Sequence, residues 1–284
     1  MALKTYKRIK DPIYGYIEIS TQYMDGIIDT ACFQRLRRIM QTSYSPLYPS
    51  AVHNRFVHSI GVFHLGKIAS NQLVSEINSK FGFSFDVARL GEVFQIACLL
   101  HDVGHAPFSH TGESFYLGEE KDFTKIHNKL IEVVDTEAFQ KDVPRERSLA
   151  AAPHEILSSI VGILSFPTFF KESSEKEFLA RCITGYKYTE KNQENDIRNC
   201  FIQLLNSKVI DVDKLDYLIR DAYAAGFDTV GIDYERLLGA LTVIKQNNTY
   251  ELAYYKGAVQ HNRECHLRSR CREKMVTKPP GSTI

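Results

Sequence analysis

Residues 87–110 read "VARLGEVFQIACLLHDVGHAPFSH", in which a mostly apolar stretch runs into three histidines and one aspartate within ten residues. The apolar residues recur every three or four positions, which predicts a helix that ends near His101 and Asp102. The chain has only ten histidines, and six of them lie between positions 53 and 110. This concentration of imidazoles at the end of a helix suggests a metal site.

Helical periodicity also dominates the chain on both sides of this stretch. We expect helices over residues 27–41, 55–78, 87–102, 154–165, 174–184, 196–207 and 211–226. Asp29 or Thr30 could cap the first of them. Asp211 is placed to cap the last of these helices, and Gly226 is placed to end it. Residues 117–150 are more polar and mixed, and we expect them to form an insertion.

Both ends of the chain favour short β elements. Residues 11–20 ("DPIYGYIEIS") are rich in aromatic and β-branched residues. Residues 241–255 alternate around Asn247 and Asn248, which predicts a hairpin that turns at these two asparagines. The predicted fold is therefore mostly α, with minor β elements at both ends.

The composition is that of an ordinary globular protein, with 44% hydrophobic and 24% charged residues among 284. A formal net charge of +1 gives no general attraction to nucleic acid or to an anionic membrane. No run of about 18 apolar residues predicts a membrane helix, and the N-terminus lacks the apolar core of a signal peptide. The six cysteines are scattered, as expected of reduced thiols. We therefore expect a cytoplasmic protein.

Four side chains form a candidate set of metal ligands. His101 and Asp102 can serve one metal only where neighbouring side chains converge, as at a helix end, while His58 lies in an earlier helix and Asp213 begins a later one. A set of two imidazoles and two carboxylates is typical of sites for Fe, Mn, Ni, Zn or Mg. A structural zinc is more often bound by thiolates. A lone histidine in a helix is more often a packed or surface residue, so the prediction depends on the combination.

Several motifs resemble the HD-domain metal phosphohydrolases, and most closely the deoxynucleoside triphosphate triphosphohydrolases of the SAM-and-HD-domain type. They are "DPIYGYIEI", "FQRLRRIMQ", "HNRFVHSIGV", "LLHDVGHAPFSH", "HEIL" and "DVDKLDYLIRD", in order between about residues 11 and 235. The resemblance implies an HD-domain helical fold over residues 1–259, without a SAM domain. It also implies that one divalent metal ion is bound by His58, His101, Asp102 and Asp213.

The same resemblance implies hydrolysis of a deoxynucleoside triphosphate to deoxynucleoside and triphosphate. His110 matches the general acid, and Glu113 stands where the family has an aspartate that orients it. His105 and His154 match the other active-site histidines, with His127 as a rival for the role of His154.

Further residues match positions that contact the substrate in this family. Arg55 and Lys214 match phosphate contacts, whereas Tyr217 and Asp221 match sugar contacts. Gln41 matches a side chain that reads the 3′ hydroxyl. The next residue is Thr42, where the close relatives have an apolar side chain, so sugar discrimination stays open. Arg55 could instead pair with a surface carboxylate, and His53 and His64 have no assigned partner.

Residues 260–284 are atypical because they cluster Cys, His and Arg without helical or strand periodicity. They are expected to be a disordered basic tail, or to be read out of frame. With suitable codons shifted by one nucleotide, Gln260–Pro280 becomes "SIIENVIYARDAEKKWLQSHP", an amphipathic helix candidate that resembles the continuation of the family. Loss of that helix would lower activity.

Two alternatives to a dNTP triphosphohydrolase remain open. The metal site could serve another nucleotide or a phosphorylated metabolite. The chain could also be a non-catalytic regulatory protein that binds single-stranded nucleic acid through the tail arginines Arg263, Arg268, Arg270 and Arg272. The resemblance implies a homo-oligomer, either a dimer or a tetramer, and no membrane partner.

Overall fold

The computed structural model describes residues 5–43, 45–116, 120–208, 210–227, 232–255 and the short strand 275–276. Its helices are α1 (Thr21–Tyr23), α2 (Ala31–Gln34), α3 (Arg55–Lys80), α4 (Val87–Leu100), α5 (Ser109–Tyr116), α6 (Glu120–Val134), α7 (Glu137–Asp142), α8 (Pro153–Ser165), α9 (Ser173–Thr184), α10 (Gln193–Leu205), α11 (Val212–Ala225) and α12 (Tyr234–Gly239). Its strands are β1 (Tyr6–Asp11), β2 (Gly15–Ser20), β3 (Leu241–Gln246), β4 (Thr249–Tyr255) and β5 (Met275–Val276). The prediction of a mostly α fold is confirmed.

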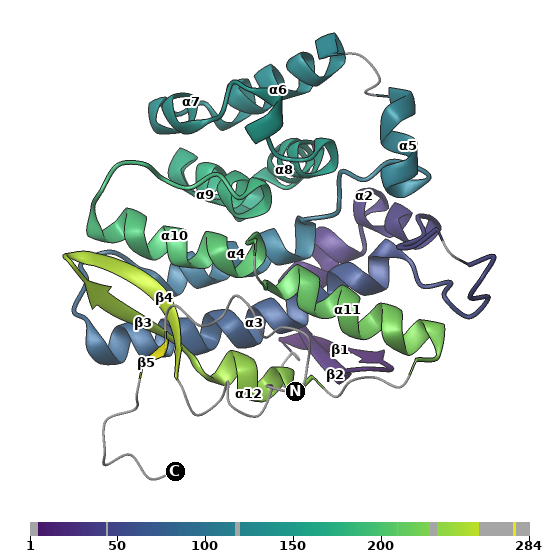
Figure 1. The fold of residues 1–284 in the computed structure, drawn as a ribbon, viewed down its shortest axis with the longest axis horizontal. Helices are drawn as coiled ribbons and strands as arrows, with labels where there is room; N and C mark the ends of the chain where they lie inside the picture. The colour runs from purple at the N-terminus through teal and green to yellow at the C-terminus, as the bar shows by residue number, and fades with distance from the viewer. Residues whose placement is uncertain are drawn as a thin grey trace.

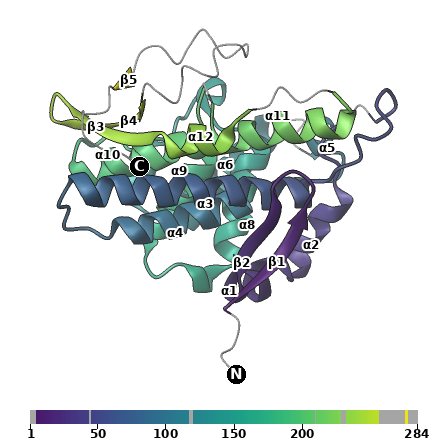
Figure 2. The same ribbon diagram turned by 90° about the horizontal axis from the view of Figure 1, so that it is seen from below.

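The long helices stack in layers around one apolar core. Helix α4 packs along α3 on one side and against α9 and α10 on the other, while α11 and α12 lie along α3 (Figures 1 and 2). Aromatic rings join these layers: the Phe94 centroid lies 5.5 Å from that of Phe201, which in turn lies 6.2 Å from that of Phe178. Burial of each such side chain contributes about 1.5–3 kcal/mol. This packing therefore fixes α4, α9 and α10 relative to one another.

The N-terminal β elements form a hairpin that crosses one end of α3 (Figure 2). Strands β1 and β2 pair antiparallel, and Ile9 faces Ile17 across the pair. The Asp11 carboxylate accepts hydrogen bonds from the backbone N–H groups of Ile13 and Tyr14, which shapes the turn.

The C-terminal hairpin is formed by β3 and β4, as predicted. Asn247 and Asn248 have φ angles of 49° and 63°, the left-handed conformation that a two-residue hairpin turn requires. Strand β5 adds to β4 in parallel, which was not predicted. The rest of the tail, with its arginines and the proposed change of reading frame, lies outside the described residues.

The two predictions for the helices around the site differ in outcome. The 211–226 prediction is confirmed, because the Asp211 carboxylate accepts from the Lys214 N–H at 2.8 Å and Gly226 ends α11 with φ 74°. The expected helix over 27–41 is confirmed only in part: Thr30, one of its two expected caps, does start a helix, but that helix is short. A π-helical turn (η1, Met24–Ile28) ends at Asp29, and the Thr30 hydroxyl then accepts from the Phe33 N–H and starts α2. A 3₁₀ turn follows at Arg35–Arg38 (η2).

The predicted insertion, residues 117–150, is helical where it is described. It contains α6, α7 and a 3₁₀ turn at Arg147–Leu149 (η3). Helix α6 lies over α8 at one end of the molecule (Figure 1). In the part of the chain that the structure describes, we find no helix with the length and apolarity needed to cross a bilayer.

Candidate metal centre and its histidine cluster

Three long helices bring His58, His101 and Asp213 together. We call these three residues the metal group, because one ligand atom from each lies within 4.8 Å of the other two. The Asp213 Oδ1 atom is 2.9 Å from His58 Nε2 and 3.6 Å from His101 Nε2. His58 is inside α3, His101 caps the end of α4, and Asp213 lies in the first turn of α11. Both imidazoles are buried.

Both imidazoles are oriented by a second hydrogen bond. His58 Nδ1 donates to Asp216 Oδ2 at 2.7 Å, and His101 Nδ1 donates to the Cys98 carbonyl at 2.9 Å. With Nδ1 donating in each ring, the Nε2 atoms face Asp213 and each other, and each becomes a free ligand atom once it gives up its proton. This is the arrangement in which histidines ligate metals. The donor set therefore fits a divalent cation.

Asp216 and Arg220, which the sequence analysis did not single out, support this arrangement. The Arg220 guanidinium donates to both oxygens of Asp216 at 2.9 Å, and to Asp11 Oδ2 at 3.0 Å. Asp216 also accepts from the Tyr14 hydroxyl at 2.8 Å. Residues 213, 216 and 220 recur on one face of α11, and this three- and four-residue spacing is the signal that could have revealed them.

Asp102 lies beside the metal group but does not belong to it. Its oxygens are 3.6 Å from His101 Nε2 and 3.8 Å from His58 Nε2, and the Arg55 guanidinium donates to Oδ2 at 2.5 Å. Arg55 is buried, so the alternative that it pairs with a surface carboxylate is wrong. The expectation that Asp102 is a fourth ligand stays a prediction.

The charges of the metal group depend on these contacts. Burial lowers the pKa of His58, but hydrogen bonds to Asp213 and Asp216 outweigh it and raise the pKa to about 10. Burial likewise opposes ionisation of Asp213, yet the hydrogen bonds from His101 and His58 hold its pKa below the usual value. Asp102 also remains ionised despite its burial, because Arg55 holds its pKa well below the usual range.

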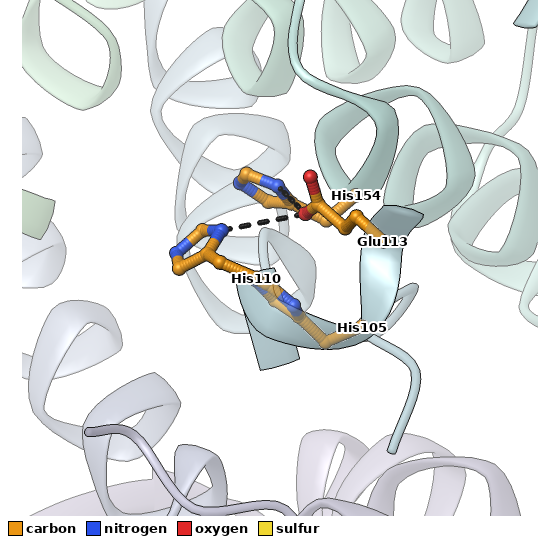
Figure 3. A group of neighbouring side chains, drawn as sticks. All are labelled: His105, His110, Glu113 and His154. Carbon is orange, nitrogen blue, oxygen red and sulfur yellow. Dashed lines mark hydrogen bonds and ion pairs between the residues drawn. The ribbon is translucent and has the colours of Figure 1, made fainter. Parts of the chain in front are cut away.

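A second set of side chains lies next to the metal group: His105, His110, Glu113 and His154, which we call the histidine cluster (Figure 3). Glu113 Oε1 accepts from His154 Nδ1 at 2.7 Å and from His110 Nδ1 at 3.3 Å. The rings of His105 and His154 stack with centroids 4.2 Å apart. The structure thus brings together all four residues predicted to be catalytic.

The histidine cluster is built on a tight turn and two helix starts. Phe108 and Ser109 both have positive φ angles, 67° and 52°, which non-glycine residues rarely adopt. Gly104 lies so close to α8 that a Cβ atom would come within 2.2 Å of the Ser158 backbone nitrogen. This close contact and the turn hold α5, which carries His110 and Glu113, beside the start of α8.

The cluster is arranged for proton transfer. Hydrogen bonds from His110 and His154 outweigh burial and lower the pKa of Glu113 to about 2, so that it stays an acceptor. Burial lowers the pKa of His105 to about 4, which keeps this ring neutral at neutral pH. His110 is the exposed member, with 62% of its side chain accessible.

A cavity of about 160 Å³ lies between the two groups of residues. The predicted site residues that line it are Gln41, Arg55, His101, Asp102, His110, His154, Asp213, Lys214 and Tyr217. Gln41 Oε1 is buried there without a hydrogen-bond donor among the described residues. The Thr42 hydroxyl instead donates to the Ala51 carbonyl at 3.5 Å.

Three predicted positions differ from expectation. Asp221 does not line the cavity, and its Oδ1 is 2.7 Å from Nε2 of His53, a histidine to which the sequence assigned no partner. The Lys214 amine is already bonded to Asp211 Oδ2 and to the Ser207 carbonyl, both at 2.6 Å. His127 lies on α6 and belongs to neither the metal group nor the histidine cluster, so it does not replace His154.

Comparison with known proteins agrees with this geometry. Residues 55–161, which contain α3, α4 and most of α8, match the HD domain family. Among relatives, the chain is 33% identical over 248 residues to the deoxynucleoside triphosphate triphosphohydrolase SAMHD1 homolog of Dictyostelium discoideum, which covers 85% of this chain and 40% of the relative. It is 30% identical over 251 residues to an uncharacterized protein of Mycoplasma genitalium, with coverages of 86% and 50%.

A solved structure shares the fold. It is a hypothetical protein from Aquifex aeolicus with a TM-score of 0.60 and 25% identity, and the match covers 90% of this chain and 55% of that one. The chain spans half or less of the length of the Dictyostelium discoideum and Mycoplasma genitalium relatives. It is an HD-domain protein, similar over most of its length to proteins named as dNTP triphosphohydrolases.

Proposed function

We propose that the chain is a metal-dependent phosphohydrolase that converts a deoxynucleoside triphosphate to deoxynucleoside and triphosphate. The observation that carries the proposal is the shared cavity: donors for a cation line one side, and the imidazoles of His110 and His154 line the other. Relatives from Dictyostelium discoideum and Danio rerio carry the name of this activity.

The charges at the cavity suit a polyphosphate. A divalent metal held by His58, His101 and Asp213, with Asp102 as the proposed fourth ligand, would supply Lewis-acid stabilisation of phosphate charge and a nucleophile near neutral pH. The Arg55 guanidinium lies between Asp102 and His110 Nε2, 3.3 Å from the latter. It can therefore bind a phosphate oxygen next to the group that gives up the proton.

His110 is the proposed general acid. Its Nδ1 donates to Glu113, so in the doubly protonated ring Nε2 would be the atom that gives its proton to the departing 5′ oxygen. His154 binds the same carboxylate oxygen and keeps Glu113 in place. We propose that His105, which stacks on His154, holds that ring in its orientation.

The sugar contacts are proposed with one change. Gln41 Oε1 is a buried acceptor that lacks a donor among the described residues, which supports a hydrogen bond from a substrate hydroxyl. Tyr217 lines the same cavity, whereas Asp221 would act only through His53. The cavity is smaller than the roughly 300 Å³ of typical ligand sites, so the base would extend beyond its described walls.

The test is a nucleotide panel with the metal-loaded protein. Purified chain with Mn²⁺ is incubated with each dNTP, each NTP and a sugar phosphate, and the phosphate products are separated. Release of triphosphate from dNTPs, lost in His101→Ala, is expected. Release of orthophosphate would support the alternative of another phosphorylated substrate. No hydrolysis by protein that retains its metal would contradict the proposal.

Other expectations from the sequence remain proposals. They are a cytoplasmic location, a dimeric or tetrameric homo-oligomer and binding of single-stranded nucleic acid by the tail. Size-exclusion chromatography with light scattering measures the oligomeric state, and a monomer would contradict the expected dimer or tetramer.

A further inference from the structure

Another cavity, of about 430 Å³, lies within the insertion, and we call it the insertion cavity. It lies between α6, α7 and the segment that leads to η3, at the end of the molecule where α6 covers α8 (Figure 1). None of its described lining residues belongs to the metal group or to the histidine cluster. Its volume is within the roughly 300–1,000 Å³ of small-molecule sites, which the cavity at the metal group does not reach.

The insertion cavity is positively charged. Arg145 and Arg147 line it, and neither forms an ion pair with any side chain that the structure describes. The Arg147 guanidinium lies 5.1 Å from the centre of the Phe123 ring, a contact that orients the planar group and leaves its N–H edges available. No carboxylate is among the described lining residues. Two guanidiniums without acidic partners suit a phosphate group.

His127 adds a buried hydrogen-bond acceptor. Its side chain lines the insertion cavity and is only 9% exposed, and Nε2 is buried with no hydrogen-bond partner among the described residues. The ring forms a hydrogen bond with the backbone of Pro144. Because proline has no N–H, its carbonyl must accept this bond from the other ring nitrogen. In the neutral ring Nε2 is then a lone pair directed at no described donor, so an N–H or O–H group of a ligand would satisfy it.

The remaining walls are suited to the uncharged part of a ligand. Phe123 stacks on His127 with ring centroids 5.9 Å apart, and together with Val143 it forms an apolar floor. The side chains of Asn128 and Gln140 lie at the wall and can donate or accept hydrogen bonds.

From these features we propose that the insertion cavity binds a small organic phosphate that also carries a hydroxyl or amino group. The phosphate binds Arg145 and Arg147, and the hydroxyl or amino group donates to His127 Nε2. Sugar phosphates and mononucleotides both have this chemistry. The inference does not depend on the proposed function, since the two cavities share no described lining residue.

The experiment is calorimetric titration of the full chain with ribose 5-phosphate, AMP and inorganic phosphate, together with hydrogen exchange of the backbone amides. We expect ribose 5-phosphate or AMP to bind and to slow exchange in residues 120–149. The variant Arg145→Gln/Arg147→Gln should weaken binding at least tenfold. The matched control Lys125→Gln/Lys129→Gln removes the same charge from exposed lysines that pair with Asp122 and Glu132, and it should bind like the parent.

His127→Leu tests the acceptor separately. It should weaken ribose 5-phosphate at least tenfold and leave inorganic phosphate unchanged, with circular dichroism to check folding. Because both arginines are exposed, the double glutamine variant remains informative if His127→Leu does not fold. Equal weakening by the lysine control, exchange protection at the metal group alone, or inorganic phosphate binding as tightly as ribose 5-phosphate would overturn the proposal.

Discussion

The metal group and the histidine cluster lie side by side, yet they are built differently. The metal group comes from three helices of the core, and a hydrogen bond to Asp216 or to the Cys98 carbonyl holds each imidazole. The histidine cluster comes from the turn after α4, the short helix α5 and the start of α8, and His110 is largely exposed. This site therefore separates a buried part that holds position from a part that is accessible at His110 and can exchange protons.

The largest effect is expected in the metal group. His101→Ala should lose its metal and, with it, any hydrolysis, because one of three converging donors is removed. Asp102→Ala should do the same if Asp102 is the fourth ligand. Metal content by plasma mass spectrometry measures both. Full occupancy in His101→Ala would show that the metal group does not hold the metal.

A large effect is also expected from the support behind the metal group. Asp216→Ala leaves Arg220 buried without its main partner, which should lower the free energy of unfolding by about 3–5 kcal/mol. It should also weaken metal binding by about 10–100-fold, because His58 loses its orientation. Urea unfolding and metal titration measure the two effects. The matched control Asp25→Ala breaks an exposed pair with Lys7 and should cost less than about 1 kcal/mol.

The same contrast explains what could be predicted from the sequence. Positions inside long periodic helices were predictable: the expected helix over 55–78 corresponds to α3, Arg55–Lys80, and it carries His58 on its buried side. In the segment 27–41 the start at Thr30 was predictable, because a threonine hydroxyl can accept from the backbone N–H three residues later, as it does from Phe33. The early end of α2 at Gln34 was not predictable, because the apolar spacing continues into the 3₁₀ turn η2.

Long-range partners were the part that could not be predicted. The spacing of Asp216 and Arg220 from Asp213 places them on one face of α11, but it does not give their partners, which are His58 of α3 and Asp11 of β1. Likewise, Asp221 pairs with His53 across 168 positions of sequence. Such pairs depend on how distant elements pack, which periodicity within one element does not report.

A smaller effect is expected in the histidine cluster. His110→Ala should keep its metal while turnover falls about 100-fold, the scale of a lost general acid. Parallel measurement of metal content and dNTP hydrolysis separates the two groups of residues. Equal turnover in variant and parent would remove His110 from this role, and loss of metal would place it among the ligands.

The smallest effect concerns the pH dependence of stability through Glu113. Hydrogen bonds from His110 and His154 lower its folded pKa to about 2 from the usual 4.5 of a glutamate. The unfolded chain therefore takes up the proton first as the pH falls, so the stabilisation is complete above pH 4.5 and is lost between pH 4.5 and 2. Because Glu113 is partly exposed, we expect only about 1–2 kcal/mol from this group after allowance for solvent screening. Glu113→Gln should show a correspondingly flatter loss of stability over that interval, as measured by urea unfolding at each pH. Glu132→Gln, at an exposed pair with Lys129, is the matched control and should follow the parent. If Glu113→Gln and the parent lose stability in parallel, the two histidines do not lower the folded pKa of Glu113. The two parts of the site would then differ only in how deeply they are buried.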